Sequence, residues 1–166
     1  GKTKKIKTSG CANGTIFENV IDEIENIKLN KRYFLSKSEI LDLSKKINTI
    51  PSLYLKSGAI HGCVLCTKKN TVAYFEDVGR HNAIDKLAGY MFLEKISPID
   101  KILYTTGRLT SEMVIKTVMM RIPLLASRSG FTAWGVQLAK KSNLTMVGRL
   151  RGKRYMLLAG KERIKN

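Results

Sequence analysis

Cys11 is the residue whose type and surroundings most clearly suggest chemistry. It is one of three cysteines in the chain, and it lies among small polar residues soon after lysines at positions 2, 4, 5 and 7. Nearby positive charge lowers the pKa of a thiol and so increases the fraction present as the reactive thiolate. A cysteine in a short, flexible and basic segment can also carry a sulfur atom between partners. The alternative is a surface cysteine without a role.

The other two cysteines, Cys63 and Cys66, are spaced like a metal-binding or redox pair. A single C-x-x-C pair is a weak signal unless further ligands accompany it. We interpret residues 59–67 as a strand, on which side chains three positions apart point to opposite faces. The two thiols then cannot bind one ion or form an unstrained disulfide. We predict that both are small buried hydrophobic residues.

The chain has two histidines, and they occupy different settings. His61 lies in an apolar strand, where a histidine is more often a satisfied core residue than a ligand. His81 opens a predicted helix beside Arg80 and Asp77, so it is the better candidate for ligand contact or proton transfer. Because no third ligand clusters with the histidines, we expect no metal site.

Four turns that follow predicted strands combine glycine with arginine. They lie at residues 76–82, 106–108, 127–130 and 148–154. Ligands of open α/β sheets bind at the carboxyl ends of the strands, where these turns would meet. Glycine lets the backbone approach a ligand closely, and the planar guanidinium group of arginine matches phosphate oxygens. The pattern predicts a site for an anionic ligand. The alternative is that the turns only cap helices and pair with acidic neighbours.

The elements that would position these residues alternate between strand and helix. Ser36 and Glu39 have the spacing of a capping box, which predicts a helix from residue 36. The other predicted elements are a short helix at 51–56, a hairpin of strands 59–67 and 71–75, a helix from residue 80, strands at 101–105, 122–126, 144–147 and 154–159, and helices at 110–120 and 132–141. This order predicts an α/β fold with a mostly parallel central sheet after an initial hairpin and helices on both faces. We expect two parts: a basic flexible loop segment at 1–35, which carries Cys11, and an α/β core at 36–166.

The charge of the chain constrains its partner. Among 166 residues there are 30 Lys and Arg against 13 Asp and Glu, a formal net charge of +17. Such a charge predicts a polyanionic partner, such as nucleic acid, an acidic protein or a phosphate-rich small molecule. The basic turns hold almost no stacking aromatic residues, which disfavours nucleic acid. The sequence shows no signal peptide and no apolar run long enough to span a membrane, so we expect a cytoplasmic protein.

The residues from Glu76 to Lys86, EDVGRHNAIDK, closely resemble the EDVGRHNA-[LI]-DK signature of the FdhD/NarQ family. Other stretches are similar to motifs of that family: SGAIH at 57–61, TGR at 106–108 with SEMV at 111–114, and LTMVG at 144–148 followed by the basic residues up to Arg154. The resemblance extends over residues 8–164. The long signature makes it highly specific.

This resemblance implies a three-layer α/β/α sandwich like the fold of the cytidine deaminases. It also implies a persulfide carrier that passes sulfur from a cysteine desulfurase to the molybdenum or tungsten bis-guanine dinucleotide cofactor of formate dehydrogenase. That cofactor would be a transient ligand. The zinc motif of the deaminases is missing, so their chemistry is not implied. The alternatives are a basic nucleotide- or nucleic-acid-binding domain without sulfur transfer and a zinc-free relative of the deaminases. A homodimer, and the N-terminal module that the family has before this loop, are left open.

The family loop carries two cysteines, of which the first holds the persulfide. Cys11 corresponds to that first cysteine, whereas Gly14 stands at the second position. The basic turn near the end of the chain contacts the cofactor in the family. We therefore expect the guanine nucleotide half of the cofactor to bind along the sheet edge. The expected contacts are Asp77, Arg80, His81, Gly107, Arg108, Ser127, Arg149, Leu150, Arg151, Gly152, Lys153 and Arg154.

Overall fold

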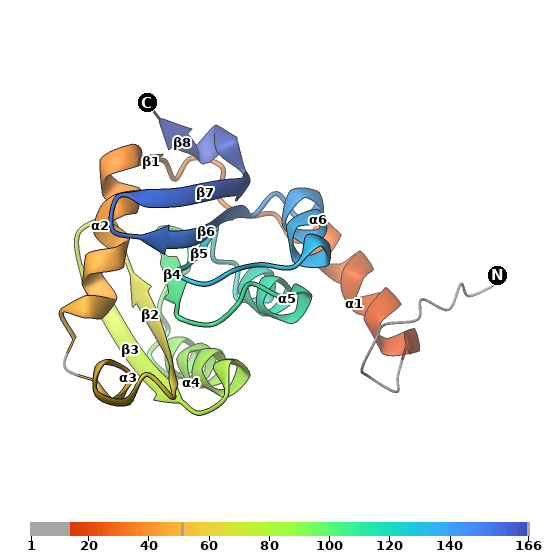
Figure 1. The fold of residues 1–166 in the computed structure, drawn as a ribbon. Coiled ribbons are helices and arrows are strands. Elements are labelled where there is room, and N and C mark those ends of the chain that lie inside the picture. Colours follow the sequence, from red (N-terminus) through yellow and green to blue (C-terminus); the bar gives the residue numbers. More distant parts are fainter. Residues whose placement is uncertain (1–13, 51, 166) are drawn as a thin grey trace, which may run out of the picture.

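The computed structural model describes residues 14–50 and 52–165 of the chain (Figure 1). Its centre is a six-stranded sheet in the order β3-β2-β4-β5-β6-β7. These strands are β2 (His61–Cys66), β3 (Thr71–Asp77), β4 (Ile102–Thr105), β5 (Leu124–Ser127), β6 (Thr145–Arg151) and β7 (Arg154–Ala159). A second sheet pairs β1 (Leu35–Ser36) in parallel with β8 (Ile164–Lys165).

The helices are α1 (Gly14–Asn26), α2 (Lys37–Asn48), α3 (Leu53–Ser57), α4 (Arg80–Leu93), α5 (Ser111–Met119), α6 (Ala133–Lys141) and the 3₁₀ helix η1 (Lys161–Arg163). Within the described residues, none of them is both long and apolar enough to cross a membrane. The capping box predicted at the start of α2 is present. The backbone N–H of Glu39 donates to Oγ of Ser36 at 3.2 Å, and the N–H of Ser36 donates to the Glu39 carboxylate at 2.7 Å.

The central sheet is mixed, with three parallel strands in its middle. β4, β5 and β6 run parallel to one another, whereas β2 is antiparallel to β3 and β4, and β7 is antiparallel to β6. The prediction of a mostly parallel sheet is therefore correct only for the middle, because the flanking hairpins have short turns that can join only antiparallel strands. β3, β4, β5 and β6 nevertheless point in one direction, which places their carboxyl ends at one edge.

Helices cover both faces of this sheet and form the expected layers (Figure 1). On one face, α4 packs on β2 and β3, α6 packs on β6 and β7, and α5 lies against α6 and α1. On the other face, α2 contacts both β2 and β6. β4 and β5 are buried along their whole length, as is typical of strands covered on two sides. The particular likeness to the cytidine deaminases stays a prediction.

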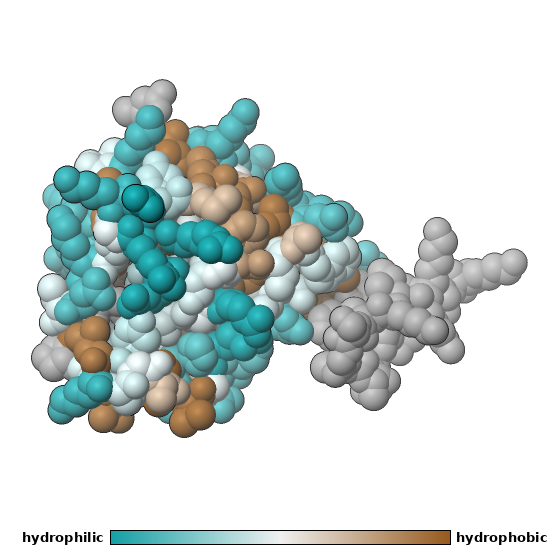
Figure 2. Space-filling view, in the orientation of Figure 1, coloured by the Kyte–Doolittle hydropathy of each residue, from teal (hydrophilic) through white to brown (hydrophobic). Residues whose placement is uncertain are grey.

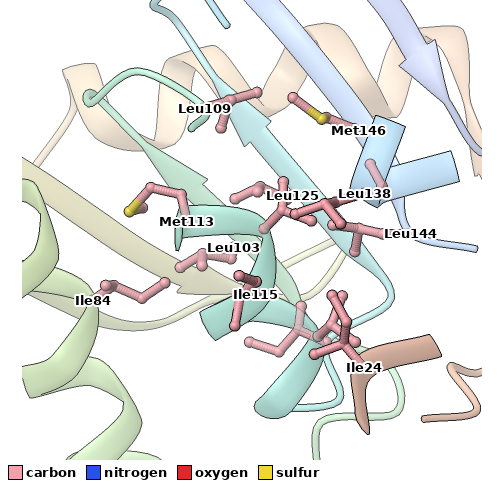
Figure 3. Packing of buried hydrophobic residues seen from close by; sticks show 14 of the residues in the cluster. Ile24, Ile84, Leu103, Leu109, Met113, Ile115, Leu125, Leu138, Leu144 and Met146 are labelled. Atoms are coloured by element: carbon pink, nitrogen blue, oxygen red, sulfur yellow. The ribbon is translucent and has the colours of Figure 1, made fainter. Parts of the chain in front are cut away.

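Successive side chains along each strand point to opposite faces of the sheet. The buried side chains therefore form two hydrophobic clusters, one on each face. Cys63 and Leu65 of β2 belong to the first cluster, together with residues of α1, α4, α5 and α6 (Figure 3). Val64 and Cys66 belong to the second, together with residues of α2. The prediction that Cys63 and Cys66 are small buried residues on opposite faces is confirmed.

Helix α1 departs from the expectation for the start of the chain. Residues 14–26 are helical, so the prediction of a flexible loop segment over residues 1–35 is wrong for this part of the chain. Ile21 and Ile24 are buried in the first cluster, and α1 packs against α5, so the core begins well before residue 36. Apolar residues at 17, 20, 21, 24 and 27 have helical spacing, a signal that was present in the sequence. Cys11 lies outside the described residues.

The guanidinium group of Arg163 is completely buried and joins three separate parts of the fold. Its Nε donates to the carbonyl oxygen of Asn30 at 2.8 Å. Its Nη1 donates to the carbonyl oxygen of Asn143 at 2.6 Å and to Oγ1 of Thr145 at 3.1 Å. Because a buried charge is costly unless it is hydrogen-bonded, these contacts hold the segment after α1, the turn before β6 and the 3₁₀ helix η1 in one arrangement.

Candidate functional site

The turns that follow β3, β4, β5 and β6 meet at one edge of the sheet. Backbone hydrogen bonds tie them together. The N–H of Leu109 donates to the carbonyl oxygen of Gly130 at 2.9 Å, and the N–H of Arg149 donates to the carbonyl oxygen of Ser129 at 2.9 Å. The prediction that the Gly-Arg turns lie together at one edge of the sheet is therefore confirmed. We call this region, residues 76–82, 106–110, 127–131 and 148–154, the carboxyl edge.

Glu76, the first carboxylate of the signature segment, caps helix α3. It accepts hydrogen bonds from the backbone N–H groups of Leu53 and Tyr54 at 3.1 and 2.8 Å and from the hydroxyl of Tyr74 at 2.6 Å. Burial by itself would raise the pKa of Glu76, but these hydrogen bonds outweigh burial and lower the pKa below its ordinary value. Glu76 therefore fixes α3 beside the carboxyl edge.

Asp77, a predicted ligand contact, shapes the turn into α4. Its carboxylate pairs with the ammonium group of Lys86 at 2.7 Å and accepts from the N–H of Gly79 at 3.0 Å and from the side-chain amide of Asn82 at 3.1 Å. The bond from Lys86, followed by the other two, holds the pKa of Asp77 at about 2. The group is thus an ionised anchor for this turn, and its contact with a ligand stays a prediction.

Arg80 lies directly against the turn after β4. A Cβ atom placed on Gly107 would be 2.8 Å from Cβ of Arg80, so only glycine leaves room for this side chain. The Nε of Arg80 is buried and has no hydrogen-bond partner among the described residues. No side chain caps the first turn of α4, which begins at Arg80. An unpaired guanidinium N–H and an uncapped helix N-terminus both favour an anion.

Two of the predicted contacts, Ser127 and Leu150, have side chains that point into the protein. The hydroxyl of Ser127 is buried; it donates to the carbonyl oxygen of Gly107 at 2.5 Å and accepts from the N–H of Ser129 at 2.9 Å. The side chain of Leu150 is completely buried in the second hydrophobic cluster. Both side chains hold the turns in place, and contact of these two residues with a ligand stays a prediction.

The hairpin of β6 and β7 carries the basic turn beyond the end of β5. The pairing of β5 with β6 ends at Val147, so residues 148–151 project past their neighbour. Arg149 and residues 151–154 are exposed, as is Arg108 on the turn after β4. Figure 2 shows hydrophilic residues gathered over this part of the surface. These arginines are the side chains most accessible to an anionic ligand.

Two aromatic residues support arginines at the carboxyl edge. The guanidinium carbon of Arg128 lies 5.4 Å from the ring centroid of Tyr54, and that of Arg149 lies 6.0 Å from the ring centroid of Phe131. Tyr54 belongs to α3, which is distant in sequence from the basic turns. Aromatic rings therefore do lie beside the basic turns in the folded chain, although the turns themselves hold almost none. Such cation–π contacts fix the arginine side chains and present flat apolar faces beside them.

His61 is not a core histidine, contrary to expectation. It is the first residue of β2, pairs with Asp77 of β3 at the carboxyl edge and is only half-buried. Its Nδ1 lies 3.4 Å from Oγ1 of Thr106. Burial lowers the pKa of His61, and the positive charge of Arg80 lowers it further. The apolar character of β2 concealed the fact that its first residue lies at the edge of the sheet.

The thiol groups of Cys63 and Cys66 are both inaccessible. Burial raises the pKa of each to about 12, so neither forms an appreciable amount of thiolate at neutral pH. Cys63 donates to Oγ1 of Thr105 at 3.5 Å, and Cys66 donates to the carbonyl oxygen of Ile102 at 3.7 Å. In the part of the chain that the structure describes, no group of three or more His, Cys, Asp and Glu residues could hold a metal ion.

Comparison with known sequences relates the chain to proteins of one name. A protein of Sulfurisphaera tokodaii called sulfur carrier protein FdhD is 35% identical over 140 residues, which cover 83% of this chain and 54% of that protein. Proteins of the same name from Listeria innocua and Bacillus pumilus are 32% and 30% identical over 139 and 163 residues. These alignments cover 84% and 98% of this chain and 53% and 62% of the two relatives.

A solved structure and a family model agree with these relatives. The crystal structure of a formate dehydrogenase accessory protein from Desulfotalea psychrophila is 36% identical and superposes with a TM-score of 0.76, covering 86% of this chain and 62% of that one. The chain thus spans between half and two thirds of the length of the proteins that it matches. The model of the FdhD/NarQ family matches residues 1–165, in agreement with the signature at 76–86 that shapes the carboxyl edge. The chain therefore belongs to the FdhD/NarQ family.

Proposed function

We propose that this chain carries sulfur as a persulfide and delivers it during the maturation of formate dehydrogenase. Its relatives are named sulfur carrier proteins, and its structural neighbour is a formate dehydrogenase accessory protein. In this proposal the donor is a cysteine desulfurase, and the acceptor is a molybdenum or tungsten bis-guanine dinucleotide cofactor. The reaction belongs in the cytoplasm, where free thiols stay reduced.

The observation that carries this proposal is the burial of two of the three cysteines. Cys63 and Cys66 are completely buried on opposite faces of the central sheet, and burial disfavours their thiolates. A sulfur carrier needs a thiolate that can reach both donor and acceptor. Cys11 is the one remaining cysteine, and the lysines before it favour the thiolate. We therefore assign the persulfide to Cys11.

Loading the carrier requires one exchange of sulfur between two thiols. The thiolate of Cys11 attacks the terminal sulfur of the persulfide on the desulfurase. A sulfur–sulfur bond forms on Cys11 while the bond within the donor persulfide breaks, and the donor cysteine leaves as a thiolate. The step has no net oxidation or reduction, so it needs no further reactant.

The carboxyl edge supports a nucleotide as the group to which the sulfur is delivered. The carboxyl edge offers exposed cations for phosphate oxygens at Arg108, Arg149, Arg151, Lys153 and Arg154, and the unpaired Nε of Arg80 lies at the same edge. Tyr54 and Phe131 add aromatic faces beside Arg128 and Arg149, which suit a purine ring. We propose that this edge binds the guanine nucleotide half of the cofactor.

Mass spectrometry tests the carrier directly. The protein is incubated with a cysteine desulfurase and cysteine, and its peptides are then searched for the added mass of one sulfur atom. We expect that mass on the Cys11 peptide and not on the peptides of Cys63 and Cys66. Cys11→Ala should lose the modification and keep its melting temperature, because Cys11 lies among small polar and basic residues in the sequence. Modification of a Cys63 or Cys66 peptide in place of Cys11 would contradict the assignment.

Calorimetry with GDP tests the ligand site. GDP should bind at low salt and more weakly at high salt, because the attraction between exposed charges is screened. Arg108→Ala should weaken binding roughly tenfold, the expected loss of one charge-assisted hydrogen bond. Arg32→Ala is a matched control, because Arg32 is exposed and lies far from the carboxyl edge. Its neighbour Asn30 donates a side-chain hydrogen bond to the carbonyl oxygen of Ile99, which precedes β4 and so lies at the opposite edge of the sheet. Absence of GDP binding, or equal losses in both variants, would remove the support for this site.

A further inference from the structure

Both histidines of the chain lie beside Arg80, although they come from different elements. His61 is the first residue of β2, and His81 follows Arg80 in the first turn of α4. The turn after β4 holds the group together. Oγ1 of Thr106 lies 3.4 Å from Nδ1 of His61, and the adjacent residue, Gly107, lies directly against the Arg80 side chain. One turn thus brings His61 and Arg80 to the same place.

The hydrogen bonds of Thr106 bear on which nitrogen of His61 carries the proton. Oγ1 of Thr106 accepts from the N–H of Gly62 at 3.0 Å, and its own hydrogen has no other acceptor among the described residues than Nδ1 of His61. We assign the hydroxyl as the donor to Nδ1, an assignment that places the proton of the neutral ring on Nε2. Nε2 makes no hydrogen bond to a described residue and is not buried, so its N–H is available to a ligand.

Two buried atoms in this group lack partners. Nε of Arg80 and Nδ1 of His81 make no hydrogen bond within the described part of the chain. Native proteins rarely leave buried polar atoms unpaired, so two such atoms on adjacent residues indicate a missing partner. Among the other charges near His81, Lys116 pairs with Asp85 at 2.7 Å, and Glu112 lies at the start of α5.

Both imidazoles are held neutral in the free protein. Burial lowers the pKa of His61 and of His81, and Arg80 is the next cause for each. For His81, Lys116 lowers the pKa further, while Glu112 and Asp85 oppose the shift. An anion bound beside Arg80 would reverse this balance, because it stabilises the protonated form of each imidazole near it.

We propose that His61, Arg80 and His81 form one oxyanion-binding cluster, which receives the diphosphate of the nucleotide ligand. The cluster rests on the proposed function only for the identity of that ligand. A bound oxyanion accepts from Nε of Arg80 and Nε2 of His61, and protonation of His81 turns its unpaired Nδ1 into a donor. Affinity for the anion increases as pH falls, because binding then takes up protons on the imidazoles.

Histidine NMR tests the cluster without any sulfur transfer. Because the chain has two histidines, the imidazole spectrum holds two signals, and His61→Asn assigns both. Asparagine keeps an acceptor for the Thr106 hydroxyl but cannot be protonated. Inorganic pyrophosphate should raise the pKa of both imidazoles by about 1 unit. Arg80→Gln should raise both pKa values in the free protein and weaken pyrophosphate binding about tenfold.

The controls separate this cluster from the proposed function. Arg32→Ala should leave both titrations as they are in the unmodified protein. If His61→Asn does not fold, His81→Asn supplies the assignment. A response to pyrophosphate at one histidine alone, or at neither, would overturn the cluster. If pyrophosphate raises both pKa values but GDP does not bind, the cluster is supported and the nucleotide part of the proposed function fails.

Discussion

Replacing Gly107 with alanine should damage the ligand site through a single added methyl group. The new Cβ would lie 2.8 Å from Cβ and 3.1 Å from Cδ of Arg80, closer than carbon atoms normally approach. The turn cannot easily withdraw, because the N–H of Gly107 donates to Oγ1 of Thr105 at 3.1 Å and its carbonyl oxygen accepts from Ser127 at 2.5 Å. Arg80, at the first position of α4, is therefore the group that must move.

The size of the effect follows from overpacking and from the lost contact. Overpacking of a well-packed site costs about 1–3 kcal/mol. A domain of this size loses roughly 2–4 °C in melting temperature for each kcal/mol, so a decrease of roughly 2–12 °C is expected. Moving Arg80 also breaks its charge-assisted hydrogen bond with the oxyanion, worth about 1.5–3 kcal/mol. Pyrophosphate affinity should then fall about 10- to 100-fold.

Thermal unfolding and calorimetry with pyrophosphate measure both effects in one preparation. Gly89→Ala is a matched control, because Gly89 lies in α4 and nothing stands within 4 Å of the Cβ that alanine would add. Alanine inside a helix is more stable than glycine by about 0.5–1 kcal/mol, so this variant should melt higher and bind normally. A Gly107→Ala protein with normal stability and normal affinity would show that the contact with Arg80 does not constrain the site.

Three further predictions concern the rest of the fold. Arg163→Met should lower the free energy of unfolding by about 1–3 kcal/mol in chemical denaturation, because it removes three hydrogen bonds from a buried position; a change below about 0.5 kcal/mol would contradict this role. Gly160→Ala should be far less stable than Gly58→Ala, since both have positive φ but only the first would place Cβ against β6 backbone; equal melting temperatures would refute the steric argument. The pKa values of His61 and His81 are lowered by folding, so the unfolded chain binds more protons below about pH 6.5. Stability should therefore fall between about pH 7 and 5 and fall less steeply in His61→Asn, and an identical pH dependence in that variant would contradict the shift.

Much of the fold could be predicted because its signals are local. The capping box of Ser36 and Glu39, the hairpin of β2 and β3, and the alternation of strand and helix after Arg80 all appear in the structure within a few residues of their predicted bounds. The missed pieces depend on distant partners. The two-residue strands β1 and β8 exist only because they pair with each other, which no pattern within either segment reveals.

The residues of the site were harder to predict than its place. Strand order and direction brought the Gly-Arg turns to one edge, as their positions after strands suggested. The sequence does not tell which polar side chains face outward from such turns. Asp77 and Ser127 satisfy neighbouring backbone groups, whereas Tyr54 reaches the site from a separate helix. His61 was misjudged because residue composition describes a strand as a whole and not the exposure of its first residue.

The pairing of β1 with β8 bears on how the protein is made. During translation the N-terminal part of the chain emerges from the ribosome first. Leu35 therefore has no strand partner until Ile164 has emerged. Arg163, which fills a buried position beside Asn30, also emerges 133 residues after Asn30. A translation product that stops shortly before residue 163 would contain the entire carboxyl edge and yet lack these closing contacts. We expect proteases to cleave such truncated chains more readily than chains that include residues 163–165, because the missing contacts leave the fold less stable.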